Sequence, residues 1–380
     1  MDLKDYRKQI DEIDEKLSKL FLERMEVSAN IAKYKIKEGL PVKDPGRERE
    51  KLAMVMEDVS VEMQPYMRTL YLTLFELGRA HQHRLTATGT NLTERVEKAI
   101  NETPKTLPDA PLVACQGVEG SFSQIACEKL FVAPNIMYFS TFDAVFSAVD
   151  QGLCRYAVLP LENSSAGSVN SIYDLMINYD FSIVRSTRIK IDHCLLVNKG
   201  TSLADIKEIY SHEQALAQCA RFLRSMDKVK ITPCENTAGA AKMLFESGRK
   251  DAAALSSASC AELYGLDSLI NSVQDFGGNY TRFICISKKM EIYPGSDKTS
   301  VMVTLPHRPG SLYHALSSLS ALGVNLTKLE SRPLPDSDFE FMFYFDFSIS
   351  VYSENFKQML IRIEESSKTL KYLGSYSEVV

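Results

Sequence analysis

Residues 3–36 carry a heptad pattern, which needs a packing partner along most of its length. Apolar side chains recur in alternating steps of three and four residues, at Leu3, Tyr6, Ile10, Ile13, Leu17, Leu20, Val27, Ile31 and Tyr34. This pattern predicts one long helix that packs as in a coiled coil. The step after Leu20 falls on Arg24, a cation that needs an anion nearby unless its charged end reaches water.

Two shorter helices complete an all-helical block, residues 1–88. One follows Asp44, which is placed as an N-cap ahead of Pro45. The next helix runs from about Gln64 to Leu85, with Tyr66, Leu70, Leu74, Leu77 and His81 on its expected buried stripe. Helices of such unequal length leave the first one half uncovered, so we expect a homodimer or a higher homo-oligomer that buries it.

The pattern changes after a Thr-, Asn- and Pro-rich linker, residues 89–110. Over residues 111–288 short strand patterns alternate with helical ones, which predicts an α/β domain with a mainly parallel sheet. The stretch is long enough for two lobes, with crossovers near residues 190 and 270, and the strand from Tyr280 would return to the first lobe. Thr281 would then lie near the cleft between the lobes, where ligands commonly bind. Residues 298–376 follow the ferredoxin-like order, strand–helix–strand–strand–helix–strand.

Composition excludes several classes of protein. A net charge of -5 argues against an obligate nucleic-acid binder. No apolar run is long enough for a membrane span, and the start Met1-Asp2-Leu3-Lys4-Asp5 lacks the apolar core of a secretory signal. The eight cysteines are scattered, mostly in apolar surroundings, without a CxxC pair. They indicate buried thiols in a reducing cytoplasm, with neither a disulfide framework nor a metal site.

Several polar side chains of the helical block lie at positions that are unusual for ordinary solvent-exposed residues: Arg7, Arg24, Lys35, Arg47 and Gln82. Cations that point into a small helical domain suit a small polyanion such as a dicarboxylate. The block has no Ser/His/Asp set, Gly-rich phosphate loop or metal-ligand spacing. A reaction there would therefore depend on charge placement.

The helical block resembles the all-helical chorismate mutase family in six segments: Tyr6-Arg7, Asp14-Glu15, Glu23-Arg24, Lys33-Tyr34-Lys35, Pro41-Val42-Lys43-Asp44 and Arg47-Glu48. The resemblance implies rearrangement of chorismate to prephenate without a cofactor, in an intertwined dimer. Three arginines would bind the substrate carboxylates: Arg7 of the partner chain, Arg24 and Arg47.

The same resemblance assigns the other mutase residues. Lys35 and Gln82 would donate to the ether oxygen as its bond breaks, and Asp44 and Glu48 would contact the hydroxyl and the ring. The family often carries Ser four residues before Gln82, where this chain has Gly78. That contact is not carried over.

The middle region resembles prephenate dehydratases in four segments: Gly117-Val118-Glu119-Gly120-Ser121-Phe122-Ser123, Pro160-Leu161-Glu162-Asn163-Ser164-Ser165 with Gly167-Ser168-Val169, Tyr210-Ser211-His212 with Gln218-Cys219, and Thr281-Arg282-Phe283. The resemblance implies a two-lobed, periplasmic-binding-protein-like fold that converts prephenate to phenylpyruvate, CO2 and water. Val118 stands where the family usually has Pro, and Gln124 stands where His is common.

In this reading Thr281 gives the leaving hydroxide a proton or a strong hydrogen bond. The remaining residues of the site would bind substrate or orient Thr281: Glu162, Asn163, Ser164, Ser211, Gln218, Arg282 and Phe283. Arg282 would either bind a carboxylate or support the loop. Taken singly, Thr281 is also explained as an ordinary β-former, and the serine-rich loops as turn and N-cap chemistry.

The C-terminal block resembles the ACT domain in Arg308-Pro309-Gly310-Ser311-Leu312 and in Asn325-Leu326-Thr327-Lys328-Leu329-Glu330-Ser331-Arg332-Pro333. Dehydratases use these segments to bind phenylalanine, so the resemblance implies feedback inhibition. The effector-binding residues would be Gly310, Ser311, Leu312, Asn325, Glu330 and Ser331. A domain that only dimerises would have the same pattern.

These blocks together predict a cytoplasmic, bifunctional chorismate mutase–prephenate dehydratase of phenylalanine biosynthesis, with no metal or cofactor. One alternative is an enzyme that prefers arogenate, and another is a solute-binding or purely regulatory protein. Lys35 and Gln82 favour an enzyme, because a binding protein has no need of them. A dehydrogenase is disfavoured, since no GxGxxG follows a predicted strand.

Overall fold

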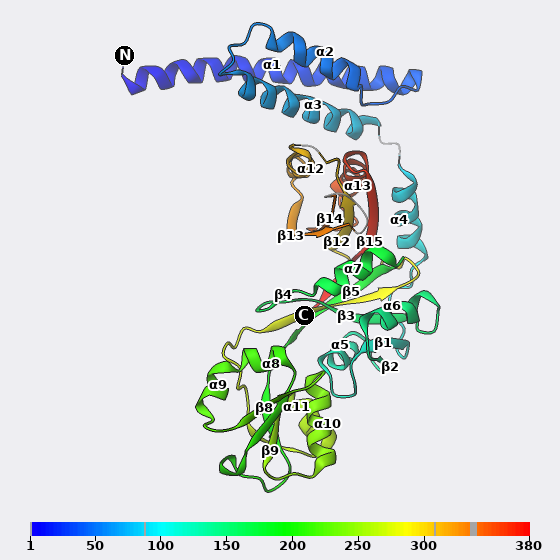
Figure 1. The fold of residues 1–380 in the computed structure, drawn as a ribbon. Coiled ribbons are helices and arrows are strands. Elements are labelled where there is room, and N and C mark those ends of the chain that lie inside the picture. The colour runs from blue at the N-terminus through cyan, green and yellow to red at the C-terminus, as the bar shows by residue number, and fades with distance from the viewer. Residues whose placement is uncertain (1, 87–88, 308, 335–339) are drawn as a thin grey trace. The chain divides into compact units, whose positions relative to one another are not determined.

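The computed structural model describes residues 2–86, 89–307, 309–334 and 340–380 (Figure 1). The chain divides into two compact units. One holds Met1–Arg95, Val303–Leu326 and Tyr352–Leu370, and the other holds Val96–Met302, Thr327–Val351 and Lys371–Val380. In the described part of the chain, no helix is long and apolar enough to cross a membrane.

The helical block consists of α1 (Leu3–Glu38), α2 (Pro45–Met56) and α3 (Gln64–Thr86), which confirms the three predicted helices. α3 packs along α1, and α2 packs on α3. The Asp2 side chain caps the start of α1, and Gly39 ends that helix in the left-handed conformation at φ 64°. The predicted N-cap of α2 is confirmed, because Asp44 accepts a hydrogen bond from the backbone N–H of Arg47 at 3.0 Å.

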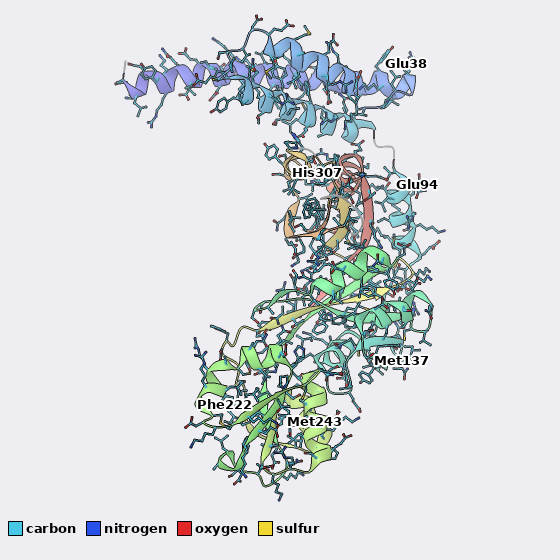
Figure 2. All side chains as sticks on the ribbon, viewed as in Figure 1. Glu38, Glu94, Met137, Phe222, Met243 and His307 are labelled. Atoms are coloured by element: carbon cyan, nitrogen blue, oxygen red, sulfur yellow. The ribbon has the colours of Figure 1, made fainter. Side chains whose placement is uncertain are left out.

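The heptad face of α1 is exposed in a single chain. All nine apolar residues of the pattern are 42–66% exposed, and within α1 just Ser28 and Ala32 are buried. Figure 2 shows side chains projecting from α1 along its length, as far as the labelled Glu38. The predicted buried stripe of α3 is wrong at Tyr66 and Leu70, which are also exposed, because none of the described residues of the single chain buries them.

The predicted linker contains a helix. α4 (Asn91–Glu102) fills its first half, and three of its apolar side chains are buried, those of Leu92, Val96 and Ala99. The sequence showed a short amphipathic piece there, and the structure extends it to a helix of 12 residues.

The first α/β sheet has seven strands in the order β16-β5-β11-β3-β1-β2, with β4 paired to β3. Its strands are β1 (Leu112–Gln116), β2 (Asn135–Phe139), β3 (Tyr156–Asn163), β4 (Gly167–Ser168), β5 (Ser182–Lys190), β11 (Tyr280–Ser287) and β16 (Glu378–Val379). The helices between them are α5 (Phe122–Leu130), α6 (Phe142–Asp150) and α7 (Asn170–Asn178).

The second sheet has five strands in the order β10-β6-β9-β7-β8. Its strands are β6 (Cys194–Val197), β7 (Glu208–Ser211), β8 (Lys230–Pro233), β9 (Ala252–Ser256) and β10 (Asp267–Ile270). Its helices are η1 (Leu203–Asp205, a 3₁₀ turn), α8 (Glu213–Gln218), α9 (Ala220–Ser225), α10 (Thr237–Ser247) and α11 (Ala258–Tyr264). The two sheets confirm the two predicted lobes.

The return of the chain to the first lobe is also confirmed. β11 lies between β5 and β3 in the first sheet. It runs antiparallel to both, because it enters from the second lobe at the edge where β3 ends. β6 is likewise antiparallel to β9. Both sheets are therefore mixed, but the prediction of mainly parallel sheets holds. Most strands of each sheet point the same way, and β11, β4 and β6 run against them.

The C-terminal block consists of β12 (Lys298–Thr304), α12 (Ser311–Ser320), β13 (Asn325–Pro333), β14 (Phe341–Ser348), α13 (Glu354–Ser366) and β15 (Thr369–Tyr376). Its sheet order is β13-β14-β12-β15, which confirms the predicted ferredoxin-like arrangement. Two predicted positions, Arg308 in the first motif and Phe339 at a strand start, lie outside the described residues. β16 follows this block and pairs with β5 of the first α/β sheet.

The backbone of β15 also approaches β5 closely. A Cβ at Gly374 would lie 2.3 Å from the carbonyl oxygen of Ile183, and the φ of Gly374 is 139°. Only glycine fits there.

The eight cysteines are free thiols, and all are buried except the half-buried Cys234, as their apolar surroundings predicted.

Candidate active sites

Several polar side chains surround the predicted catalytic hydroxyl of Thr281 at the start of β11. Thr281 pairs with Asn163 of β3 in the antiparallel register, and both side chains are buried. Asn163 Nδ2 donates to Thr281 Oγ1 at 2.9 Å and to Asn279 Oδ1 at 2.7 Å. The sequence therefore places three polar side chains together at the edge where β3 ends and β11 begins.

The Asn163 amide is held in one orientation by the loop that follows it. Its Oδ1 accepts hydrogen bonds from the backbone N–H groups of Ser165 and Ala166, at 3.0 and 2.9 Å, and from Ser165 Oγ at 2.7 Å. These donors can only meet an oxygen, so they turn the NH2 group toward Thr281.

The second lobe contributes Gln218, from the end of α8. Gln218 Nε2 donates to Ser165 Oγ at 3.1 Å, and Gln218 Oε1 accepts from Asn279 Nδ2 at 3.0 Å. His193, between β5 and β6, lies 3.1 Å from the same Oε1 through its Nε2. Burial lowers the pKa of His193, which favours a neutral ring. Uncharged amides thus connect Thr281 with the segment that joins the two lobes.

The other predicted dehydratase residues lie apart from Thr281. Ser164 ties the loop to β11, since its Oγ donates to Gly278 O and accepts from the Tyr280 N–H, both at 2.9 Å. Ser211 is fully buried and donates to Leu255 O at 2.7 Å. Phe283 is part of the apolar core below the sheet.

Glu162 and Arg282 face away from the Thr281 group. They pair with each other in the register next to Thr281 and Asn163, and successive side chains of a strand point to opposite faces. Arg282 Nη1 lies 3.2 Å from Glu162 Oε1. The structure therefore groups Thr281, Asn163 and Gln218 and separates them from this ion pair.

In the helical block, Arg24 of α1 and Gln82 of α3 each form a hydrogen bond across to the other helix. Arg24 is half-buried, and its Nη1 donates to Leu74 O at 2.9 Å. Gln82 is buried, and its Nε2 donates to Ser28 Oγ at 2.9 Å, while Ser28 Oγ donates to Gly78 O at 3.2 Å. A Cβ at Gly78 would lie 3.4 Å from Arg24 Nη1 and 3.5 Å from Ser28 Oγ.

The remaining predicted mutase residues make contacts of other kinds. Lys35 Nζ donates to Val42 O at 2.5 Å, and Glu48 pairs with Arg79. Arg47 is exposed and pairs with Glu50 at 2.7 Å. Asp44 caps α2, as described above, and Arg7 is exposed on the N-terminal half of α1.

The predicted effector residues occupy the expected elements. Gly310 is the N-cap of α12, in the left-handed conformation at φ 84°, with Ser311 and Leu312 in the first turn. Asn325 opens β13, which also carries Glu330 and Ser331. Glu330 accepts a hydrogen bond from Ser168 of β4.

Sequence reasoning missed four members of these groups: Ser28, Ser165, His193 and Asn279. Ser165 and Asn279 stand inside segments that the sequence singled out, so their polarity beside Asn163 and Thr281 was an available signal. Ser28 lies one helical turn after Arg24, a position that shares its face. Nothing local marks His193, because the crossover that brings it to Gln218 is a tertiary feature.

Comparison with known proteins supports both blocks. A family model described as chorismate mutase type II matches residues 6–83, and one described as prephenate dehydratase matches residues 113–291. The bifunctional chorismate mutase/prephenate dehydratase of Escherichia coli (strain K12) is 31% identical over 382 residues, 97% of this chain and 95% of that protein. The chain belongs to the bifunctional chorismate mutase/prephenate dehydratase family.

Two further similarities concern the dehydratase part. Arogenate dehydratase/prephenate dehydratase 2, chloroplastic, of Arabidopsis thaliana is 38% identical over 276 residues, 70% of this chain and 72% of that protein. The prephenate dehydratase from Arthrobacter aurescens, solved in complex with L-Phe, is 28% identical with a TM-score of 0.64, over 70% of this chain and 90% of that one. As a member of the family, this chain is an enzyme of phenylalanine biosynthesis with a chorismate mutase domain and a prephenate dehydratase domain.

The Ser28 hydroxyl is expected to hold Gln82 for the mutase reaction. Ser28→Ala removes the acceptor of Gln82 Nε2, and the loss of about one hydrogen bond should lower mutase kcat/KM about 10-fold. Dehydratase kinetics of the same preparation should not change. Ser18→Ala, on the exposed surface of the same helix, is the matched control, and unchanged mutase kinetics in Ser28→Ala would contradict the assignment.

Proposed function

We propose that the α1–α3 block binds chorismate through its carboxylates and rearranges it to prephenate by charge placement alone. The half-buried Arg24 carries this proposal. Within the described residues its guanidinium meets a carbonyl and forms no salt bridge, and burial lowers its pKa. A cation held in that way is stabilised by an anionic ligand.

The other residues act on the same substrate. Arg47, with Arg7 of a second copy, would bind carboxylate oxygens. Lys35 Nζ and Gln82 Nε2 would donate to the ether oxygen, where negative charge develops as the C–O bond breaks. Asp44 and Glu48 would contact the hydroxyl and the ring, and Glu48 would leave Arg79 to do so.

Helix geometry supports the contribution of a second copy. Arg7 and Arg24 are 17 residues apart on α1, which is about 26 Å along the helix axis. One chain cannot bring both to one small substrate. An intertwined dimer would cover the exposed heptad face and supply Arg7 to the partner's site.

Mixing two inactive variants tests this shared site. Arg7→Ala and Lys35→Ala should each lower mutase activity at least 10²-fold. After subunit exchange, a heterodimer holds one doubly defective site and one intact site, so about a quarter of normal mutase activity should return. Two variants that stay inactive together, although mass spectrometry shows heterodimers, would place Arg7 in its own chain's site.

For the dehydratase we propose that Thr281 donates its hydroxyl proton to the departing hydroxyl of prephenate. Thr281 Oγ1 accepts a hydrogen bond from Asn163, so its own proton can be donated elsewhere. As the carboxylate C–C bond breaks to release CO2, its electrons move through the ring and expel the hydroxyl as water. Solvent returns the proton to Thr281, and the aromatic ring of phenylpyruvate forms.

Uncharged donors would hold the substrate carboxylates in this site. Asn163, Gln218, Asn279 and Ser165 supply amide and hydroxyl groups from both lobes. Arogenate is the second candidate substrate, because the Arabidopsis relative is named for both compounds. We place the enzyme in the cytoplasm, where its eight free thiols would stay reduced.

Two substitutions should separate the activities. Thr281→Ala should lower dehydratase kcat at least 10²-fold and spare mutase, and Lys35→Ala should do the reverse. Chorismate loss and phenylpyruvate absorbance in alkali measure the two reactions, with prephenate and arogenate compared as substrates. Thr281→Ser, which keeps a hydroxyl, is the conservative control. Full dehydratase activity in Thr281→Ala would refute the catalytic role.

We further propose that the C-terminal block is an ACT domain that binds phenylalanine and inhibits the dehydratase. Its support is the ferredoxin-like order, the N-cap glycine of α12 and the L-Phe complex of the A. aurescens enzyme. The head group would meet backbone groups of Gly310, Ser311 and Leu312, and the second segment would contribute Asn325, Glu330 and Ser331.

A phenylalanine titration tests this regulation. L-Phenylalanine should lower dehydratase activity and give a calorimetric heat of binding, while mutase activity provides an internal comparison. D-Phenylalanine has the same ring and an inverted head group. If backbone groups bind the head group, D-phenylalanine should neither inhibit the dehydratase nor give a heat of binding. If L-phenylalanine does not change dehydratase activity and shows no measurable binding, the proposed regulatory role of the domain is wrong.

A further inference from the structure

Arg282 is committed to groups of the protein. Its side chain is 8% exposed and faces away from Thr281. Nη1 donates to Asp346 Oδ2 at 2.5 Å as well as to Glu162, and Nη2 donates to the Tyr376 hydroxyl at 2.7 Å. This guanidinium is not available to a substrate carboxylate beside Thr281.

The partners of Arg282 on β14 and β15 form a buried set. Asp346 is 1% exposed and also accepts a hydrogen bond from Ser300 of β12, which is joined to the Tyr376 hydroxyl at 2.6 Å. Burial would lower the pKa of Arg282, but Tyr376 and Asp346 outweigh it and raise that pKa. A buried ion pair of this kind is strongly sensitive to removal of either partner.

A second ion pair joins Glu162, the other carboxylate partner of Arg282, to β13. Lys328 Nζ donates to Glu162 Oε2 at 2.6 Å and to Ser168 Oγ at 3.0 Å. Burial would raise the pKa of Glu162, but the hydrogen bond and charge of Lys328, together with Arg282, lower it. Glu162 therefore bridges two cations, and the four residues Arg282, Asp346, Glu162 and Lys328 form one charge cluster.

On both strands, a residue of the charge cluster is the direct neighbour of a residue of the Thr281–Asn163 hydrogen bond. Arg282 follows Thr281 on β11, and Glu162 precedes Asn163 on β3. One face of this strand pair holds the Asn163–Thr281 hydrogen bond, and the other holds the Arg282–Glu162 pair. Because neighbouring residues share a planar peptide, a displacement of Arg282 turns the backbone that carries Thr281.

We propose that the charge cluster positions Thr281 and Asn163 for the dehydratase reaction, so that the C-terminal sheet controls the site through Arg282 and Glu162. The inference rests on the proposed catalytic role of Thr281. Arg282 and Glu162 are positioning residues, since they act through their neighbours. Lys328 lies on β13, the strand that carries the proposed effector residue Glu330, so an effector that shifts β13 moves a member of the cluster.

Steady-state kinetics of cluster variants test the proposal. Arg282→Gln and Asp346→Asn should each lower dehydratase kcat on the order of 10-fold to 10²-fold, with the KM for prephenate nearly unchanged. The double variant should be no worse than either single one, because both remove the same ion pair. Arg282→Lys should retain more activity than Arg282→Gln. A residue that bound substrate directly would instead raise KM, and Asp346→Asn would not reproduce its effect.

Arg332, which lies on β13 like Lys328, provides a matched control. It forms a bidentate pair with Asp174 of α7, at 2.8 and 2.9 Å, that is far more exposed than the Arg282 pair. Arg332→Gln should leave dehydratase kinetics unchanged. If Asp346→Asn fails to fold, Lys328→Met, at a half-buried position, takes its place and should lower kcat several-fold and weaken inhibition by phenylalanine.

The outcomes separate this inference from the proposed function. In a Thr281→Ala background, Arg282→Gln should cause no further loss, because it acts through Thr281. If Thr281→Ala removes activity while Asp346→Asn and Lys328→Met keep normal kcat, the inference is wrong and the catalytic proposal stands. If Thr281→Ala is fully active, the catalytic proposal is wrong. If Arg332→Gln lowers kcat as much as the cluster variants do, the cluster contributes only to the general stability of the domain. That result would also overturn the inference.

Discussion

The antiparallel pairing of β11 with β3 is the constraint on which the dehydratase domain depends. It sets Thr281 opposite Asn163 and Arg282 opposite Glu162. Because the side-chain period of a strand is two, a slip of one residue would move the hydroxyl to the face of the ion pair and the guanidinium to the face of the amides. The register is held from both sides. Ser164 ties the loop to β11 on one side, and the ion pairs with the C-terminal sheet hold it on the other.

A different constraint, helix length, organises the mutase domain. α1 extends well beyond the part that α3 covers, and its apolar face stays exposed in a single chain. Each proposed mutase site would lie along a helix that also contributes to the proposed dimer. Binding energy for chorismate and stability of the assembly would therefore depend on the same residues of α1.

Local patterns predicted most of the elements, and tertiary features account for the errors. The boundaries of α13 and β15 follow from the sequence pattern, and the ferredoxin-like order needed no further information. The antiparallel direction of β11 did not follow, because it depends on the lobe from which the strand returns. Thr281, Asn163 and Gln218 were predicted from the family resemblance, and the structure groups them. Ser211 and Phe283, equally part of the resemblance, are buried in contacts that no sequence motif reports.

The charge of the cluster argues that its effect on the dehydratase is mechanical. Arg282 and Lys328 pair with Asp346 and Glu162, and Glu378 and Glu330 lie within 3.8 and 3.7 Å of the same two cations, so each cation of the cluster is compensated by carboxylates of the protein. The group that donates to Thr281 is the uncharged amide of Asn163, which also donates to the amide of Asn279. The mutase block, in contrast, keeps a half-buried cation without a carboxylate partner among the described residues. One reaction would then depend on an unpaired cation, and the other on the position of a neutral hydroxyl, which the ion-pair cluster would set through the backbone that it shares with Thr281.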